Sequence, residues 1–325
     1  MNVLHVISSI DPALGGVVEA VRGLCIGMAT AGHRSDVACS DSENAAFKPH
    51  FPARVYALGP VTGKYAYNSN LSKWLAVHAP AYDAVIVHGL WQFHSLAAWR
   101  ALRNSATPYF VFTHGMLDPW FKRRYPLKHL KKWLYWPWAD YRVLRDAQAV
   151  LFTSQEECQQ ARKSFWLYRC RERVASLGIL APGSDIQTQR GEFLKRCPEA
   201  KGKRVLLFLG RLDVKKGCDL VVEAFARVAQ KAPHLHLVMA GPDHSSFGKK
   251  VRESCRALGI SDRVSWPGML TGPAKWGAYR CADGFILPSH QENFGFAVVE
   301  ALSCGVPVLI SNKICLLYTS PSPRD

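Results

Sequence analysis

Residues 290–300 read His-Gln-Glu-Asn-Phe-Gly-Phe-Ala-Val-Val-Glu, and they join a short apolar run, Gly284 to Leu287, to a helical pattern from Phe296 to Cys304. A strand, a loop and a helix in this order are typical of a parallel sheet covered by helices. Gly295 lets the backbone approach a ligand closely, and the free amides at the following helix start form an anion site suited to a diphosphate. The residues expected at this site are Asn293, Phe294, Gly295 and Phe296.

Glu300 lies in the otherwise apolar stretch Ala-Val-Val-Glu-Ala-Leu. An ionised carboxylate is costly on a buried helix face unless something hydrogen-bonds it, and sugar or ribose hydroxyls would do so. The alternative is that Glu300 points to solvent between buried neighbours, because charged residues are mostly exposed.

A second motif, Gly-Arg-Leu-Asp-Val-Lys-Lys-Gly at residues 210–217, follows the predicted strand Val205 to Leu209. It places Arg211 and Lys216 at the carboxyl end of that strand. Such cations can neutralise a leaving diphosphate, although a lone basic loop is more often a solvated turn.

Short β-rich runs alternate with helical stretches along the whole chain, which predicts an α/β protein with parallel sheets. The other predicted strands are Val3 to Ser8, Asp36 to Cys39, Arg54 to Leu58, Ala84 to His88, Tyr109 to Thr113, Ala149 to Thr153, His236 to Ala240, Val264 to Trp266 and Val306 to Ile310. The other predicted helices in the second half are Asp219 to Gln230, Lys249 to Leu258 and Trp276 to Cys281. The spacing of Ser154 and Glu157 indicates a capping box at the start of one further helix.

The length of 325 residues favours two domains. We expect an N-terminal, acceptor-side domain over residues 1–180, a linker rich in Pro, Gly and charge over 181–203, and a C-terminal domain over 204–314. After the last predicted strand no covering helix follows, so we expect residues 315–325 to be a non-native tail of an incomplete second domain. A natural disordered tail is the alternative.

The composition is globular, with 48% hydrophobic residues and a net charge of +16, so the surface should attract phosphates of nucleotides, nucleic acids or lipids. Charge alone does not choose among these. The ten cysteines contain no Cys-x-x-Cys pair, which suits reduced thiols. The N-terminus lacks signal-peptide features, and no apolar run approaches a membrane span, so we expect a cytoplasmic protein.

The pattern Gly-Arg-Leu-x-x-x-Lys-Gly followed by Glu-x7-Glu resembles the retaining GT-B glycosyltransferases of family GT4, and the resemblance spans residues 1–314. It implies two Rossmann-like domains whose parallel sheets face each other across a cleft. It also implies that Arg211 and Lys216 bind the donor diphosphate, that Glu292 lies against the donor sugar and that Glu300 binds the ribose. Residues 180–185, Leu-Ala-Pro-Gly-Ser-Asp, depart from the family's Pro-Asn-Gly loop.

In the first domain the resemblance implies that Gly15 and Gly16 bring backbone amides to the donor phosphates. A Gly-Gly pair alone is weak evidence, since a tight turn also explains it, and the absence of G-x-G-x-x-G lowers an NAD-binding interpretation. His114, in Thr-His-Gly after a predicted strand, matches the family's His-Gly and is expected to hydrogen-bond the transferred sugar or orient the acceptor. His88, in His-Gly-Leu-Trp, is a secondary acceptor-side candidate.

The resemblance implies transfer of a hexose from a nucleotide-sugar to a glycan or lipid-linked acceptor with retention, in envelope or exopolysaccharide biosynthesis. We expect front-side attack in which the departing phosphate helps to take the acceptor proton. No cofactor is expected beyond the donor itself, and no metal, because there is no Asp-x-Asp motif and Arg211 and Lys216 can neutralise the charge.

From Trp120 to Arg145, aromatic residues are interleaved with lysines and arginines. This composition favours a peripheral contact with an anionic membrane surface, on the inner face of the cytoplasmic membrane. The alternatives are a helix with an aromatic core face and a solvated basic face, or a nucleic-acid patch, which we do not expect because no nucleic-acid module surrounds it.

Other functions remain open at this point. A sugar-nucleotide epimerase or a phosphorylase can be built on the same scaffold, since a fold does not determine a reaction. A non-catalytic nucleotide-sugar-binding protein is the alternative from another class. The donor nucleotide, the sugar, the acceptor and the oligomeric state are not encoded in any pattern that we recognise.

Overall fold

The computed structural model describes residues 1–243 and 246–314. The predicted non-native tail, residues 315–325, therefore lies outside the described residues. The chain forms two compact units, Met1–Gly178 and, among the described residues, 179–314, and each has its own sheet and core.

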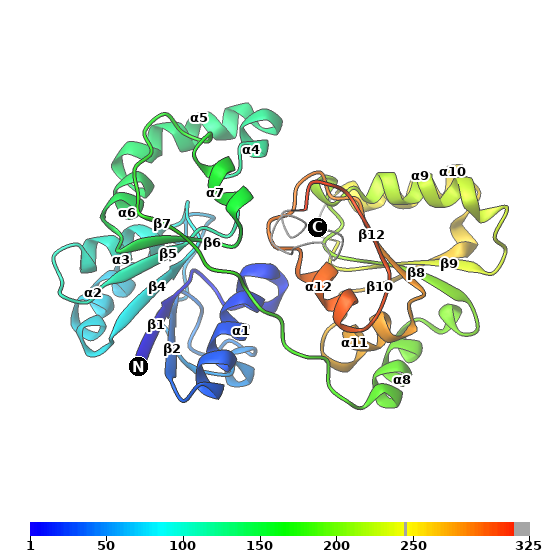
Figure 1. Ribbon diagram of the computed structural model, residues 1–325, viewed down its shortest axis with the longest axis horizontal. Helices are drawn as coiled ribbons and strands as arrows, with labels where there is room; N and C mark the ends of the chain where they lie inside the picture. Colours follow the sequence, from blue (N-terminus) through cyan, green and yellow to red (C-terminus); the bar gives the residue numbers. More distant parts are fainter. Residues whose placement is uncertain (244–245, 315–325) are drawn as a thin grey trace, which may run out of the picture. The chain divides into compact units, whose positions relative to one another are not determined.

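Unit 1 is built on a parallel sheet in the order β3-β2-β1-β4-β5-β6-β7 (Figure 1). The strands are β1 (Asn2–Val6), β2 (Arg34–Cys39), β3 (Arg54–Ala57), β4 (Ala84–His88), β5 (Tyr109–Phe112), β6 (Ala149–Phe152) and β7 (Glu172–Val174). The helices are α1 (Gly16–Thr30), α2 (Ser69–His78), α3 (Phe93–Leu102), α4 (Trp120–Arg124), α5 (Pro126–Tyr135), α6 (Asp140–Asp146) and α7 (Gln155–Ala161).

Unit 2 has a smaller parallel sheet in the order β10-β9-β8-β11-β12 (Figure 1). Its strands are β8 (Arg204–Leu209), β9 (Leu235–Ala240), β10 (Val264–Gly268), β11 (Gly284–Leu287) and β12 (Val308–Ile310). Its helices are α8 (Ile186–Arg196), α9 (Cys218–Ala229), α10 (Ser246–Ala257), α11 (Gly272–Cys281) and α12 (Phe296–Ser303).

The central strands are apolar and buried because helices cover both faces of each sheet, as all-parallel sheets require. In β1 and β4, Leu4, Val6, Val85 and Val87 are fully buried. In β8, Leu207 and Phe208 are fully buried as well, and Phe225 of α9 packs with them. The predicted strands therefore correspond to β1–β6 and β8–β12.

The expected linker at residues 181–203 carries helix α8 instead. Phe193 on this helix is fully buried in the core of unit 2. A Cβ added at Gly277 of α11 would lie 1.9 Å from the carbonyl oxygen of Gln189, so the missing side chain lets the two helices touch. Most residues of α8 are polar and only one narrow face of it is buried, so its apolar pattern was too weak to predict a helix.

β7 was also missed. Two of its three residues, Glu172 and Arg173, are charged, and the strand is largely exposed at the edge of the sheet, where apolar patterning is not needed.

Candidate active site

The two loops that carry the sequence motifs meet at the carboxyl edge of the sheet in unit 2. Arg211 follows β8, and residues 288–295 follow its neighbour β11. Gly217 has φ of +67°, and a Cβ there would lie 2.4 Å from the carbonyl oxygen of Pro288, so a larger residue would push the loops apart. The His290 amide donates to the Lys215 carbonyl at 2.8 Å, which ties the loops together.

An ion pair between Lys216 and Glu292 links the two motifs directly, and both side chains are largely buried. Although burial alone would raise the pKa of Glu292, the positive charges of Lys216, Lys215 and Arg211 outweigh it, and the pKa is lowered. Glu292 is therefore ionised at neutral pH. Three cations converge on one carboxylate, so the site carries an excess of positive charge that suits a diphosphate.

The loop between β11 and α12 contains buried polar atoms that lack partners. Among the described residues, no hydrogen bond reaches Ser289 Oγ, Gln291 Oε1 or Asn293 Oδ1. Unpartnered buried polar atoms are rare in folded proteins, and a bound ligand is one way to satisfy them.

Gly295 adopts φ of +73° as the N-cap of α12, and no side chain caps this helix. Its first amides are therefore available to an acceptor from a ligand. Phe294 is buried and its ring packs edge-on against Phe296, with centroids 4.8 Å apart. The expected ligand contacts of this segment therefore rest on backbone groups and Asn293, while the phenyl ring of Phe294 packs inside the loop.

Glu300 is buried and does not point to solvent, so the solvent-facing alternative is wrong. Lys275 Nζ lies 2.7 Å from its Oε1, and the Tyr279 hydroxyl donates to its Oε2 at 2.9 Å. These partners on α11 satisfy the carboxylate inside unit 2. A carboxylate accepts about four hydrogen bonds, of which the described residues supply these two, and the binding of ribose hydroxyls stays a prediction.

In unit 1 the candidate residues also lie at the carboxyl edge of the sheet. Gly15 and Gly16 follow β1, and His114 follows β5, with β4 between these two strands. Gly15 has φ of +78° and is the N-cap of α1, whose first turn no side chain caps. His114 has φ of +49°, a strained value for a residue with a Cβ.

His88 does not have the position expected of an acceptor-side residue. Its side chain is only 1% exposed, and both ring nitrogens are engaged, Nε2 with His5 at 2.9 Å and Nδ1 with His114 at 3.0 Å. This corrects the sequence interpretation, because the ring offers no free nitrogen to a substrate. His88 does lie at a strand end, as predicted, but the direction of its ring depends on which strands are neighbours.

Glu157 positions the loop that contains His114, a role that its capping-box spacing in the sequence does not reveal. Its amide donates to Ser154 Oγ, as predicted for the capping box. Its carboxylate accepts from the Thr153 amide instead of that of Ser154, and also from the Thr113 hydroxyl and the Gly115 amide at 2.7 and 2.6 Å. Glu157 therefore holds the loop that contains His114 against the start of α7.

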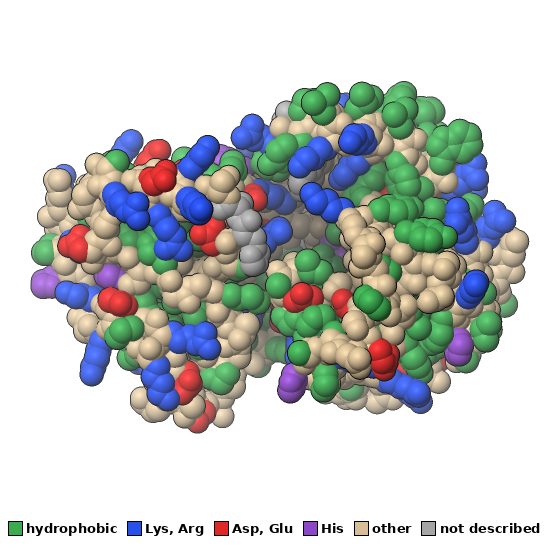
Figure 2. All heavy atoms as spheres, turned by 180° about the vertical axis from the view of Figure 1, so that it is seen from behind, with side chains coloured by type: hydrophobic (Ala, Val, Ile, Leu, Met, Phe, Trp, Pro, Cys, Tyr) green, Lys and Arg blue, Asp and Glu red, His purple; other side chains and the backbone are tan. Residues whose placement is uncertain are grey.

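The predicted membrane-facing segment forms α4, α5 and α6. No residue of α5 is buried, and hydrophobic side chains gather among Lys and Arg at the top of unit 1 (Figure 2). The exposed ones are Leu127, Leu130, Trp133, Leu134 and Trp138. The alternative of an aromatic core face is only partly right, because α5 exposes Trp133 whereas Tyr135 packs half-buried against the core and Trp136, just after the helix, is fully buried.

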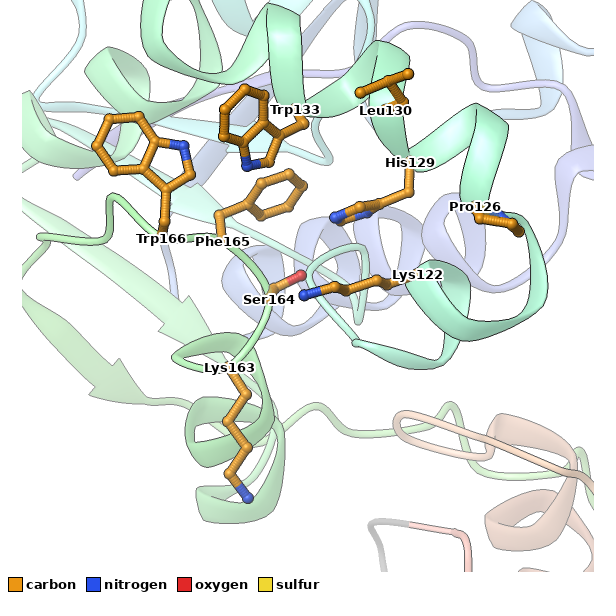
Figure 3. Close-up of a pocket in the computed structure, with 9 residues that line it drawn as sticks. All are labelled: Lys122, Pro126, His129, Leu130, Trp133, Lys163, Ser164, Phe165 and Trp166. Atoms are coloured by element: carbon orange, nitrogen blue, oxygen red, sulfur yellow. The ribbon is translucent and has the colours of Figure 1, made fainter.

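A cavity of about 670 Å³ lies between α4, α5 and the segment after α7 (Figure 3). Trp133, Phe165 and Trp166 form an aromatic group on one side of it, and the ring of His129 stacks on Phe165 with centroids 4.9 Å apart. Lys122 points toward Ser164, while Lys163 extends away from the aromatic group. The cavity therefore combines an aromatic wall with cations at its rim.

No helix within residues 1–243 and 246–314 is long and apolar enough to cross a membrane.

The chain is similar to known proteins in fold and in sequence. The chain superposes on the solved structure of Anabaena HepE in complex with UDP-glucose with a TM-score of 0.74, at 17% identity, covering 99% of this chain and 83% of HepE. It is 32% identical over 114 residues to mannosylfructose-phosphate synthase of Agrobacterium fabrum, covering 33% of this chain. It is 28% identical over 178 residues to D-inositol 3-phosphate glycosyltransferase of Nocardiopsis dassonvillei, covering 51% of this chain. These matches span only 25% and 40% of the two relatives' lengths.

The two units and their parallel sheets thus define a protein of the GT-B fold. Residues 15–178 match the family described as glycosyl transferase 4-like domain, and residues 189–317 match glycosyl transferases group 1. The chain belongs to the GT4-type glycosyltransferases.

Proposed function

We propose that the protein transfers a hexose from a nucleoside diphosphate sugar to a glycan or lipid-linked acceptor with retention of configuration, in envelope or exopolysaccharide biosynthesis. The observation that carries this proposal is the Lys216–Glu292 pair, which joins two motifs around an excess of positive charge. UDP is the nucleotide to test first, because HepE, a structural neighbour, was solved with UDP-glucose.

In the proposed reaction, the bond between C1 of the sugar and the diphosphate oxygen breaks, and its electron pair goes to the departing diphosphate. Arg211 and Lys216 stabilise this growing negative charge. The acceptor oxygen forms a bond to C1 on the same face, and its proton passes to the departing phosphate. The protein contributes charge stabilisation and positioning, with no cofactor and no metal in the proposed scheme.

A panel of nucleotides and nucleotide-sugars tests this proposal. In calorimetric titrations with UDP, GDP and ADP, we expect one nucleotide to bind with a dissociation constant of about 1 µM to 1 mM. The matching sugar donors are then assayed for hydrolysis and transfer, and the anomeric configuration of the product is read by proton NMR.

Each result of the panel points to one function. A product with inverted configuration would contradict retention. An epimerised sugar-nucleotide would indicate an epimerase, phosphate-dependent cleavage would indicate a phosphorylase, and binding without turnover would indicate a non-catalytic binding protein. If none of the three nucleotides bound, the proposal would fail.

We further propose that unit 1 contacts an anionic membrane surface of the cytoplasmic side through α5, and that the cavity beside it takes the lipid part of the acceptor. Leu127, Leu130 and Leu134 are 80%, 55% and 61% exposed and lie on one face of the helix at spacings of three and four residues. Lys128 and Lys131 on the same helix are exposed, whereas the ammonium of Lys132 lies over the Trp91 ring, 4.3 Å from its centroid. An apolar face bordered by lysines is typical of helices that lie in a membrane interface.

Vesicle flotation measures this contact. We expect the protein to float with vesicles that contain anionic phosphatidylglycerol at low salt, and binding to weaken as salt screens the lysines. Replacing Leu134 and Trp138 by Ser should lower the bound fraction severalfold, because both side chains are more than half exposed. Val77→Ser on α2 removes a 73% exposed side chain elsewhere and serves as the matched control. Protein that stays at the bottom of the gradient at low salt would contradict the proposal.

A further inference from the structure

A row of three histidines crosses the middle of the sheet in unit 1. His5 Nδ1 lies 2.9 Å from His88 Nε2, and His88 Nδ1 lies 3.0 Å from His114 Nε2. His5 and His88 are 0% and 1% exposed, whereas His114 is half-buried. The row of histidines therefore runs from the core of unit 1 to the carboxyl edge of its sheet, where the candidate site residues lie.

The strand register explains the row. His5 of β1 pairs with Ile86 of β4, so His88, two residues further on, points to the same face of the sheet. His88 in turn pairs with Phe112 of β5, and His114 lies two residues beyond it. Two neighbouring strands and the loop after the third thus contribute one histidine each. Each histidine lies two residues beyond the partner of the previous one.

Hydrogen bonding couples the three rings. A neutral imidazole has one N–H and one lone pair, so each bond in the row needs a donor on one side and an acceptor on the other. Only two arrangements satisfy both bonds. Either all three rings carry the proton on Nδ1, or all three carry it on Nε2.

The buried end of the row discriminates between these arrangements. His5 Nε2 is buried and has no partner among the described residues. With the protons on Nδ1, this atom is an unpaired acceptor, whereas with the protons on Nε2 it is an unpaired N–H donor. Unpaired buried N–H groups are the rarer of the two in folded proteins.

His94, in the same unit, also leaves a buried ring nitrogen as an unpaired acceptor and not as an unpaired N–H donor. Its Nε2 lies 2.8 Å from the carbonyl oxygen of His88, to which it must donate. Its other nitrogen, Nδ1, is buried and unpartnered among the described residues, so it is left as the acceptor. The unit therefore leaves a lone pair unsatisfied at this neighbouring histidine.

We propose that His5 and His88 are positioning residues that hold His114 in its Nδ1–H form, so that His114 presents a hydrogen-bond donor to a sugar or phosphate oxygen of the ligand. No hydrogen bond of the described residues involves Nδ1 of His114. The ligand part of this inference rests on the proposed function, but the state of the rings does not.

Burial also keeps His114 neutral. Burial lowers the pKa of His114 to about 3 and that of His5 to about 4, and it lowers the pKa of His88 further below its ordinary value. An added proton would place an N–H against another N–H in the row. His114 therefore serves as a neutral donor at physiological pH.

Long-range ¹H–¹⁵N correlation spectra of the full chain labelled at histidine test the inference, because they distinguish a protonated from an unprotonated ring nitrogen. At pH 7 we expect Nδ1–H rings at His5, His88 and His114, although the Nε2–H form predominates for a histidine in water. His88→Leu interrupts the row, and the His114 signal should then shift toward the Nε2–H form. Exposed His78, replaced by Gln, is the control that leaves the pattern unchanged.

Nε2–H signals for His88 and His114 in the unaltered protein would overturn the inference, as would an unchanged His114 signal in His88→Leu. This result does not depend on catalysis. Nδ1–H rings in a chain that transfers no sugar would leave the inference standing and refute the proposed function, and Nε2–H rings in an active enzyme would do the reverse.

A pair of substitutions tests the donor role itself. Asn and Asp both tolerate the positive φ of His114. His114→Asn keeps an N–H donor near the place of Nδ1, whereas ionised His114→Asp has only acceptors. We expect kcat/KM of the Asp variant to be at least about tenfold below that of the Asn variant at matched thermal stability. Equal values would contradict the donor role.

Discussion

Lys216→Ala is expected to lower the rate of sugar transfer by a factor of about 10² to 10³, the usual effect of removing one group that stabilises developing charge. Lys216 pairs with Glu292 at the carboxyl edge of the sheet in unit 2, close to Lys215 and Arg211. The diphosphate gains charge as it departs, so the lysine interacts more strongly with the transition state than with the bound donor. We therefore expect kcat to fall more than KM rises.

Glu292→Gln tests the other half of this pair. Removing Lys216 leaves the Glu292 carboxylate with weaker compensation, so its pKa should rise toward its ordinary value. Because the two residues act together, the loss in Lys216→Ala combined with Glu292→Gln should be smaller than the product of the single losses.

Lys231→Ala provides the control for the loss of a positive charge. Lys231 is exposed and follows α9, toward the opposite edge of the same sheet. Transfer should be unchanged in this variant. Equal losses in the Lys231 and Lys216 variants would show that net charge matters and that the ion pair does not.

Acidification below pH 6.5 is expected to destabilise unit 1 strongly. Burial lowers the pKa of His5 and His94 to about 4 and that of His114 to about 3, and it lowers that of His88 well below its ordinary value. Between about pH 4 and 6.5, the unfolded chain therefore binds more protons than the folded unit. Stability falls as pH falls, by about 1.4 kcal/mol per pH unit for each histidine that stays neutral.

One buried carboxyl group opposes this trend. Asp140 is fully buried and accepts from the Trp91 amide and the Ser95 hydroxyl, both at 2.9 Å, and burial raises its pKa to about 6. The folded state then binds a proton that the unfolded state has lost, so this group alone would favour folding as pH falls toward 4. A single group does not offset four histidines.

Thermal unfolding followed at several pH values checks this prediction. We expect the transition of unit 1 to move to lower temperature between pH 6.5 and 4, and His5→Leu to make that dependence shallower because one titrating group is lost. His78→Gln removes an exposed histidine of the same unit and should keep the original slope. A transition that does not move over this range would contradict the assignment of four buried neutral histidines.

The sequence predicted the central strands well because each of them is an apolar run between turn residues. Local patterning decides such segments, and β4 and β11 begin and end at the predicted residues. It failed at β7 and α8, where burial is small or limited to one face of a polar helix. In β7 and α8 the secondary structure depends on the surface against which the segment packs. The local sequence pattern does not show that surface.

The candidate site shows the same difference between what local sequence predicts and what long-range packing decides. The sequence motifs alone predicted Arg211, Lys216, Glu292 and His114 as site residues. Glycine loops at strand ends, with charged residues beside them, can be recognised in the sequence. The structure brings Lys216 and Glu292 into contact across two loops. Their roles toward a donor remain predictions that the substitutions above test.

Only the tertiary structure assigned the partners of the buried polar groups. Glu157 in α7 reaches Thr113 and Gly115 in the loop after the neighbouring strand β5, and Tyr279 satisfies Glu300 from another helix. His5, His88 and His114 meet because β4 lies between β1 and β5. Amino-acid order determined which residues form strands and which loops carry charge, since periodicity and turn chemistry are local. Strand adjacency and register are long-range, so they alone decided which buried donors and acceptors face one another.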